Sequence, residues 1–313
     1  MLTFVLRRLG ILLLTLGLVT VIGFLLIHIT PGDPAVAAAG PDADQATIAA
    51  TRVELGLDRP LVVQFWEYTT GLVRLDFGTS FDGGRPVLDA ITDRLPATLS
   101  LVIASLLVAL LISIPLGVGT AVHRGSIWDR IGVLLASLGV ALPDFFVGLV
   151  LVLVLALQLG IFDATGYVPL FDDPIQWAYL LVLPALTLGT TVAAELTRHI
   201  RASVSDVLEL DYVRTARSKG LGSTRVILKH ASRNAAMPVV TVFGNQIARL
   251  LGGTVIVEQI FSIPGIGQLL VQSVFTRDIP MVLGIGIFIA MIVLLVNVLI
   301  DLSYGWLNPR VRA

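Results

Sequence analysis

Long apolar stretches recur six times along the chain, and polar segments separate them. Each stretch is bounded by charged residues or by proline and glycine, and each approaches or exceeds the roughly 20 residues that a helix needs to cross a bilayer. Because irregular backbone cannot face lipid, all six are predicted to be transmembrane helices. The stretches are Leu9–Ile29, Ala97–Val122, Ile131–Leu159, Ala178–Leu196, Met237–Val257 and Met281–Ser303.

The composition and the distribution of charge extend this prediction. Of the 313 residues, 56% are hydrophobic and only 14% are charged, whereas a soluble domain has about 25% charged residues. Eight of the 21 Lys and Arg residues lie between Arg198 and Arg233. Because basic loops stay on the cytoplasmic side, we predict an all-α integral membrane protein with both termini in the cytoplasm.

The first apolar stretch has a secretory signal peptide as its alternative interpretation, because Arg7 and Arg8 precede it and small residues follow at 35–37. The apolar region of a signal peptide spans only about 7–15 residues. The stretch Leu9–Ile29 is longer, and prolines separate it from the small residues. We therefore expect an uncleaved first transmembrane helix.

A long segment, residues 31–96, is predicted to form an outer subdomain between the first and second spans. Apolar residues recur at helical spacing in Ala46–Leu57 and in Leu61–Leu75. Acidic residues outnumber basic ones in the segment, so both a solvated lid and a docking surface stay open. The rest of the chain divides into an N-terminal part, 1–30, and a membrane core, 97–313.

Proline and glycine lie inside several of the predicted spans. Pro115, Pro143 and Pro184 each remove a backbone hydrogen bond, so kinks are expected there. Such kinks occur both in helices that open and close a transport path and in helices with a purely structural role, so they do not by themselves indicate transport. For Gly252 and Gly253 in the fifth span we predict close helix packing, with a gate as the alternative.

The sequence contains none of the common catalytic or energy-converting motifs. It has no Gly-x-x-x-x-Gly-Lys-Ser/Thr phosphate-binding loop, no His-Glu-x-x-His zinc motif and no Gly-x-Ser-x-Gly nucleophile, and cysteine is absent. We therefore expect no enzyme activity, no cofactor or metal bound by this chain, and no nucleic-acid partner. Energy for any transport must then come from another chain.

The segment 199–236 is a basic, polar loop between two apolar spans. Tyr212–Lys219 and Thr224–Ala231 can each form a helix of about two turns, and Gly220 permits a reversal between them. This predicts a helix–turn–helix outside the membrane. Binding of anionic lipid headgroups accounts for the charge. A surface gripped by another protein also accounts for the glycine between the two helical segments.

The sequence of this loop resembles the cytoplasmic EAA coupling motif of type I ABC importer permeases. Tyr212–Leu221 followed by His230–Pro238 is closest to the version in the peptide/nickel subfamily, as in dipeptide and oligopeptide permeases. Arg214 stands at the acidic first position of the motif. Other segments fit the subfamily in order along the chain: Arg7-Arg8, Pro31–Pro34, Leu55–Pro60, Asp76–Ser80, Glu258–Gly267, Arg277–Pro280, Asp301–Tyr304 and Asn308–Arg310.

The resemblance implies alternating access across a bacterial or archaeal cytoplasmic membrane. This chain would be one of two permease subunits, and the resemblance favours a paralogue over a second copy as the other. Two cytoplasmic ABC ATPases would hold the ATP, and an extracytoplasmic binding protein would deliver the substrate. The resemblance assigns ATPase coupling to Tyr212, Arg214, Thr215, Ala216, Lys219, Gly220, Leu221, His230, Arg233 and Asn234.

The cargo implied by the resemblance is a di- or oligopeptide. Nickel chelates, glutathione-like compounds and oligosaccharides are the alternatives within the same importer class. The competing class is a self-sufficient secondary transporter. The sequence shows no inverted repeat, and a secondary transporter has no use for the coupling loop, so we favour the importer.

Polar residues inside the predicted spans mark a candidate substrate path, because charge at membrane depth is costly. Asp144 and Arg249 each lie near the middle of a span, roughly 20 Å deep at 1.5 Å per residue. A structural ion pair and a pair that lines the path and meets peptide termini are both open. Asn245 and Gln246 complete the candidate path. Glu195 is assigned only to local hydrogen bonding near the cytoplasmic end.

Overall fold

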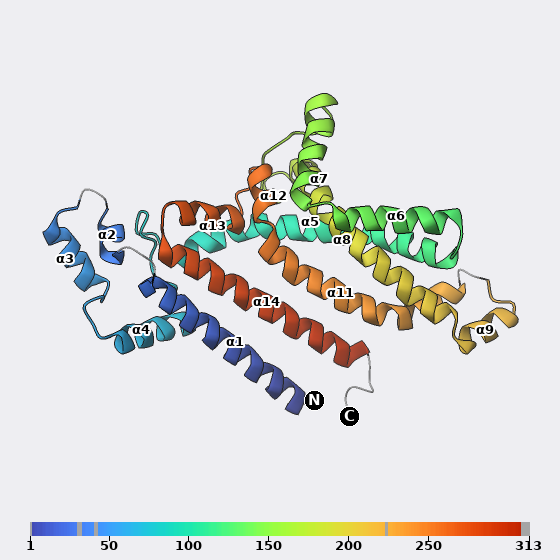
Figure 1. Ribbon diagram of the computed structural model, residues 1–313, viewed down its shortest axis with the longest axis horizontal. Coiled ribbons are helices and arrows are strands. Elements are labelled where there is room, and N and C mark those ends of the chain that lie inside the picture. The colour runs from blue at the N-terminus through green and yellow to red at the C-terminus, as the bar shows by residue number, and fades with distance from the viewer. Residues whose placement is uncertain (1, 30–32, 41–42, 223–224, 308–313) are drawn as a thin grey trace. The chain divides into compact units, whose positions relative to one another are not determined.

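The computed structural model describes residues 2–29, 33–40, 43–222 and 225–307. Within these ranges the chain forms helices joined by turns, with one isolated β-bridge between Thr79 and Pro86 (Figure 1). The residues separate into two compact units. The first unit comprises 1–96 and 264–295, and the second comprises 97–263 and 296–313.

The first unit is built around an apolar core. Its elements are α1 (Leu2–Ile29), α2 (Pro34–Ala39), α3 (Gln45–Glu54), α4 (Leu61–Val73), the first turns of α5 (Val87–Val122), α13 (Ile266–Phe275) and most of α14 (Ile279–Leu307). The core residues are Phe77, Val87, Ala90, Ile91, Ile266, Met281, Ile285 and Ile287. The helices α3 and α4 confirm the two that helical spacing predicted in the outer segment.

Two distant loops of the first unit meet at Asp278. Its buried carboxylate accepts a hydrogen bond from the hydroxyl of Ser80, and others from the backbone N–H groups of Phe81 at 3.2 Å and Met281 at 3.3 Å. Asp278 directly precedes α14, so it caps the first turn of that helix. The same carboxylate thereby fixes the outer loop to the start of α14.

The second unit is organised around one long helix, α8, which packs against both α6 and α11 (Figure 1). The other elements lead into or out of these three. After the rest of α5, the elements of the unit are, in chain order, α6 (Ile127–Ala141), α7 (Asp144–Leu151), the π-helix η1 (Val152–Gln158), α8 (Pro174–Leu208), α9 (Asp211–Ser218), the π-helix η2 (Val226–Ala231), α11 (Ser232–Gly253) and α12 (Val255–Ile260).

Glycines allow the helices of the second unit to approach closely. A Cβ atom at Gly139 of α6 would lie 2.7 Å from the Cβ of Ala194 on α8, and one at Gly117 of α5 would lie 2.7 Å from the Cβ of Ile200. Such contacts are typical of membrane helices, where small residues bring backbones together. The packing role predicted for Gly252 and Gly253 is wrong within this chain, since no other described residue lies within 4 Å of a Cβ built there.

The third predicted span is not one continuous helix. It is broken between α6 and α7, whose axes differ by 102°. Leu142 is extended, with a φ of −83° and a ψ of 130°, as expected for a residue before proline, and Pro143 has no N–H to continue the helix. The count along one continuous helix that placed Asp144 near the middle of a span therefore does not apply, because Asp144 is the first residue of a new helix.

Helices cover all six predicted apolar stretches, but fewer meet the length and apolarity expected of a span. In the described part of the chain three helices do so, or four if the bent pair α6–α7 counts as one. The fifth stretch, α11, carries polar and charged residues, which lower its apolarity. The count of six spans and the cytoplasmic termini stay predictions.

Candidate functional site

The helix predicted just before Gly220 is present as α9, and it ends in a Schellman motif. Gly220 has a φ of +80°. Its N–H donates to the carbonyl of Arg217 at 2.9 Å, and the N–H of Leu221 donates to the carbonyl of Ala216 at 3.4 Å. This pair of bonds defines the motif, and the left-handed position between them favours glycine. The sharp turn predicted at Gly220 is confirmed.

The second half of the predicted helix–turn–helix is different from expectation. The residues after the turn form the π-helix η2, which continues without a break into α11. No proline or glycine separates Val226 from Met237, so nothing in the sequence ends the helix there. The loop is therefore one short helix packed against the base of a long one.

The coupling residues assigned by resemblance fall on both faces of α9. Val213 and Ala216, three residues apart, are buried against the chain, so Ala216 is a packing residue. Tyr212, Arg214 and Thr215 are exposed, as are Lys219 and Gly220 beyond the helix end.

One hydrogen bond joins two of these predicted residues across the loop. The side-chain amide of Asn234, in the first turn of α11, donates to the Tyr212 hydroxyl at 2.9 Å. The side chains of His230 and Arg233 lie outside the described residues. The structure thus positions an exposed polar face on α9, and the coupling role of these residues stays a prediction.

An ion pair that the sequence analysis missed joins α6 to α8 near this loop. Arg201 donates to both carboxylate oxygens of Asp129, at 2.6 and 2.9 Å, and the Gly125 N–H donates to Asp129 at 2.9 Å. Ser126, three residues before the acid, accepts a hydrogen bond from the Asp129 N–H at 3.3 Å. That capping pattern was the available sequence signal for Asp129.

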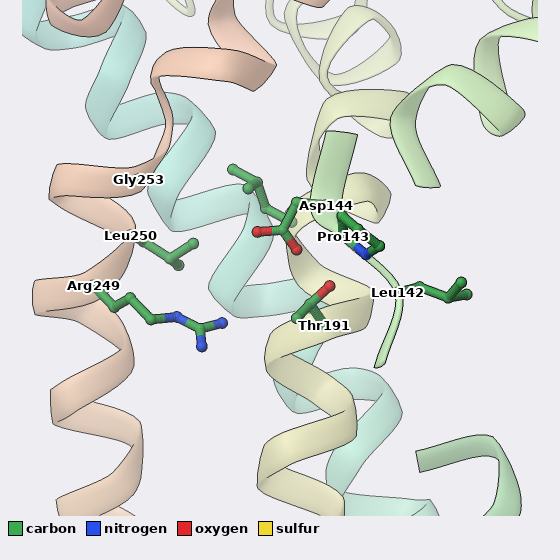
Figure 2. Close-up of a pocket in the computed structure, with 8 residues that line it drawn as sticks. Leu142, Pro143, Asp144, Thr191, Arg249, Leu250 and Gly253 are labelled. Carbon is green, nitrogen blue, oxygen red and sulfur yellow. The ribbon is translucent and has the colours of Figure 1, made fainter. Parts of the chain in front are cut away.

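A cavity of about 300 Å³ opens at the break between α6 and α7, between α8 and α11. Its lining residues are Leu142, Pro143, Asp144, Leu188, Thr191, Arg249, Leu250 and Gly253. Figure 2 shows the Asp144 carboxylate and the Thr191 hydroxyl facing the cavity from one side, with the Arg249 guanidinium reaching in from α11. Asp144 and Arg249, distant in sequence, therefore share one cavity.

The ion pair predicted as one option for Asp144 and Arg249 is not formed. Arg249 instead donates to Glu195 of α8 at 3.3 Å. Glu195 lies one turn of α8 beyond Thr191, so both face α11. The interpretation of Glu195 as a merely local hydrogen-bonding group is wrong. Its partner is 54 residues away in sequence, which no periodicity reveals.

Three buried polar atoms in this region have no hydrogen-bond partner in the described part of the chain. They are Asp144 Oδ1, Thr191 Oγ1 and Gln246 Oε1. Gln246 is on α11, one turn before Arg249 and Leu250, and does not line the cavity, whereas Asn245 is exposed. Of the four residues predicted for the path, Asp144 and Arg249 are brought together and the other two are not.

Another buried carboxylate lies directly after the fifth predicted span. Glu258 is fully buried in α12 and accepts hydrogen bonds from the hydroxyls of Thr98 and Thr254, each at 2.8 Å. Because both hydroxyls donate to it, the Glu258 carboxylate is a hydrogen-bonded buried group, and it joins α12 to α5. These are the features of a structural contact.

Comparison with known proteins decides the family. Residues 113–313 match the family described as binding-protein-dependent transport system inner membrane component, and residues 1–102 match the N-terminal family of the same membrane components. The chain belongs to this permease family. It is the permease subunit of a type I ABC importer of the peptide/nickel subfamily.

Several relatives align with this permease over nearly their whole length. The glutathione transport system permease protein GsiC of Salmonella choleraesuis is 43% identical over 312 residues, which cover 100% of this chain and 99% of the relative. GsiC of Escherichia coli O1:K1 is 42% identical over the same length. A putative peptide transport system permease protein of Brucella abortus is 40% identical, covering 98% of each chain.

The fold is also similar to that of a solved transporter. An inward-facing structure of the MetNI methionine ABC transporter superimposes with a TM-score of 0.56 at 17% identity. The match covers 70% of this permease and 96% of that chain. At this identity the similarity supports the all-helical permease fold and nothing about the substrate.

Proposed function

We propose that this permease forms half of the pathway through which an ATP-driven importer carries short peptides into the cytoplasm. The observation that carries the proposal is the full-length similarity to relatives named as glutathione and putative peptide permeases. Glutathione is itself a tripeptide, so the two names share one chemical class. The partners are a paralogous permease, two ATPases that hold the ATP, and an extracytoplasmic binding protein.

The exposed face of α9 is proposed as the contact with one ATPase. Val213 and Ala216 pack the helix onto the permease, and Tyr212 is bonded to the base of α11. A short helix that packs on one face against α8 and η2 moves together with the elements beneath it. Movement of the ATPase would therefore reach α8 and α11 together.

The conformation of Gly220 provides a test of coupling. A β-branched residue cannot adopt a positive φ without strain, so Gly220→Val should disrupt the turn at a cost of at least about 1–2 kcal/mol. Because 1.4 kcal/mol is a tenfold change in an equilibrium, peptide-stimulated ATP hydrolysis by the reconstituted importer should fall about tenfold. Asparagine tolerates a positive φ, so Gly220→Asn should keep most of the stimulation.

The matched control is Gly222→Val, two residues further on. Gly222 is exposed, has ordinary φ and has no other part of the described chain within 4 Å of a Cβ built on its backbone. Membrane insertion and assembly of all variants are checked by co-purification with the ATPase. Full stimulation in Gly220→Val, or equal loss in Gly222→Val, would contradict the proposed role of the turn.

The cargo is tested separately with a panel of ligands. The reconstituted importer with its binding protein is offered dialanine, glutathione, a nickel chelate and a disaccharide, and ATP hydrolysis and uptake are measured. Stimulation by the two peptides supports the proposal. Stimulation by the chelate or the sugar alone refutes the peptide assignment and leaves the importer assignment intact.

A further inference from the structure

The cavity at the α6–α7 break has an unusual balance of charge. Three ionisable side chains surround or adjoin it: Asp144 at the break, Glu195 on α8 and Arg249 on α11. Arg249 is already hydrogen-bonded to Glu195. Among the described residues the Asp144 carboxylate therefore has no cationic partner, and the three groups together carry one uncompensated negative charge.

The polar atoms on the Asp144 side of the cavity need hydrogen-bond donors. Within the described ranges, Asp144 Oδ1 is a buried acceptor without a partner, and the neighbouring Thr191 hydroxyl, which can donate or accept, has no partner either. Leu142, Leu188 and Leu250 form apolar walls around them. A carboxylate in such surroundings interacts strongly with a cation that can enter, because the local dielectric constant is low.

We propose that Asp144 and Thr191 form a receptor for the free ammonium group of the cargo. A primary ammonium has three N–H donors and one positive charge, which matches a carboxylate with a hydroxyl beside it. Arg249 lines the opposite side of the cavity, and its guanidinium is paired with Glu195 rather than with Asp144. This inference rests on the proposed function, and it narrows the cargo to peptides with an unblocked amino terminus.

The ammonium site separates the candidate cargoes by their chemistry. Dipeptides, oligopeptides and glutathione all carry a free α-ammonium group. Oligosaccharides without amino groups do not. A nickel chelate whose amines are bound to the metal has no ammonium to donate.

The first experiment measures binding to the permease without the binding protein, whose own selectivity would hide that of the cavity. The purified complex of both permeases and both ATPases is heated with dialanine or with N-acetyldialanine at millimolar concentration. Dialanine should raise the melting temperature, because a ligand that binds the native state stabilises it. N-acetyldialanine, which has no ammonium, should not.

The variants then test which residues are responsible. Asp144→Asn keeps the shape and removes the charge, and Thr191→Val removes only the hydroxyl. We expect Asp144→Asn to weaken the response to dialanine about tenfold or more, in line with a lost charge-assisted hydrogen bond. Thr191→Val should weaken it less, and the matched control Thr191→Ser should leave it unchanged. Co-purification of both permeases with both ATPases shows that each variant is assembled.

The results distinguish failure of the ammonium site from failure of the proposed peptide transport. Equal stabilisation by both dipeptides, no stabilisation by either, or a wild-type response in Asp144→Asn overturns the ammonium site. If the complete wild-type importer takes up dialanine while these results are negative, peptide transport stands and only the site is wrong. If it takes up no peptide, the proposed function itself fails.

Discussion

The ion pair between Asp129 and Arg201 provides the sharpest test of how the second unit is held together. Asp129 is buried at the start of α6, and its side chain is only 7% exposed, whereas that of Arg201 is 29% exposed. Two hydrogen bonds from Arg201 and one from the Gly125 N–H converge on the carboxylate. Asp129→Ala removes all three and leaves a guanidinium and an amide without their partner.

The expected cost follows from the burial of the pair. Breaking a fully buried ion pair costs about 3–5 kcal/mol, mostly because the remaining charge is uncompensated. Water reaches Arg201, so we reduce this to about 2–3 kcal/mol for Asp129→Ala. An internal standard is the pair between Arg124 and Glu209, at 2.5 Å but 59% and 65% exposed. Exposed pairs contribute only about 0–1 kcal/mol.

The assay is a pair of double-mutant cycles. Single and double alanine variants of each pair are unfolded by SDS in mixed micelles, and the free energy of unfolding gives the interaction energy within each pair. We expect about 2 kcal/mol for Asp129 with Arg201 and less than about 0.5 kcal/mol for Arg124 with Glu209. Equal interaction energies in the two cycles would refute the reasoning from burial.

Three further predictions concern packing and buried polar groups. Asp278→Ala removes the cap of α14 and should lower the stability of the first unit by about 1–2 kcal/mol, detected as faster hydrogen exchange at the start of that helix. Gly139→Val places a side chain against Ala194 and should cost about 1–3 kcal/mol in SDS unfolding, whereas Gly119→Val, in open space, should cost little. Glu258→Gln keeps an acceptor and should cost less than Glu258→Leu, which we expect to cost about 1–3 kcal/mol because it removes the acceptor of two buried hydroxyl hydrogen bonds; equal losses would contradict this.

The parts of the structure that depend on local sequence were predictable. The helix α9 and its turn follow from a polar helical segment that ends at Gly220, because the Schellman motif needs only neighbouring residues. The outer helices α3 and α4 follow from apolar spacing in the same way. Pro143 indicated a kink, but the size of the bend depends on how α6 and α7 each pack on α8, which sequence spacing does not contain.

The contacts that define the cavity were not predictable from one sequence. Asp144 and Arg249 were singled out because they are charged residues in apolar stretches. Their arrangement depends on Glu195, which competes for Arg249 from a different helix. Whether Arg249 pairs with Asp144 or with Glu195 depends on how α8 and α11 are rotated relative to each other. That rotation results from long-range packing, which one sequence does not reveal.

Because η2 continues directly into α11, a movement of the loop at the base of α11 also moves the residues of α11 that line the cavity. From Ser232 to Arg249 the helix rises about 25 Å at 1.5 Å per residue. A tilt of α11 against α8 by about 10° at its base would therefore displace Arg249 by about 4 Å. That displacement exceeds the 3.3 Å separation between Arg249 and Glu195. A small tilt at the base of α11 is thus geometrically sufficient to separate Arg249 from Glu195.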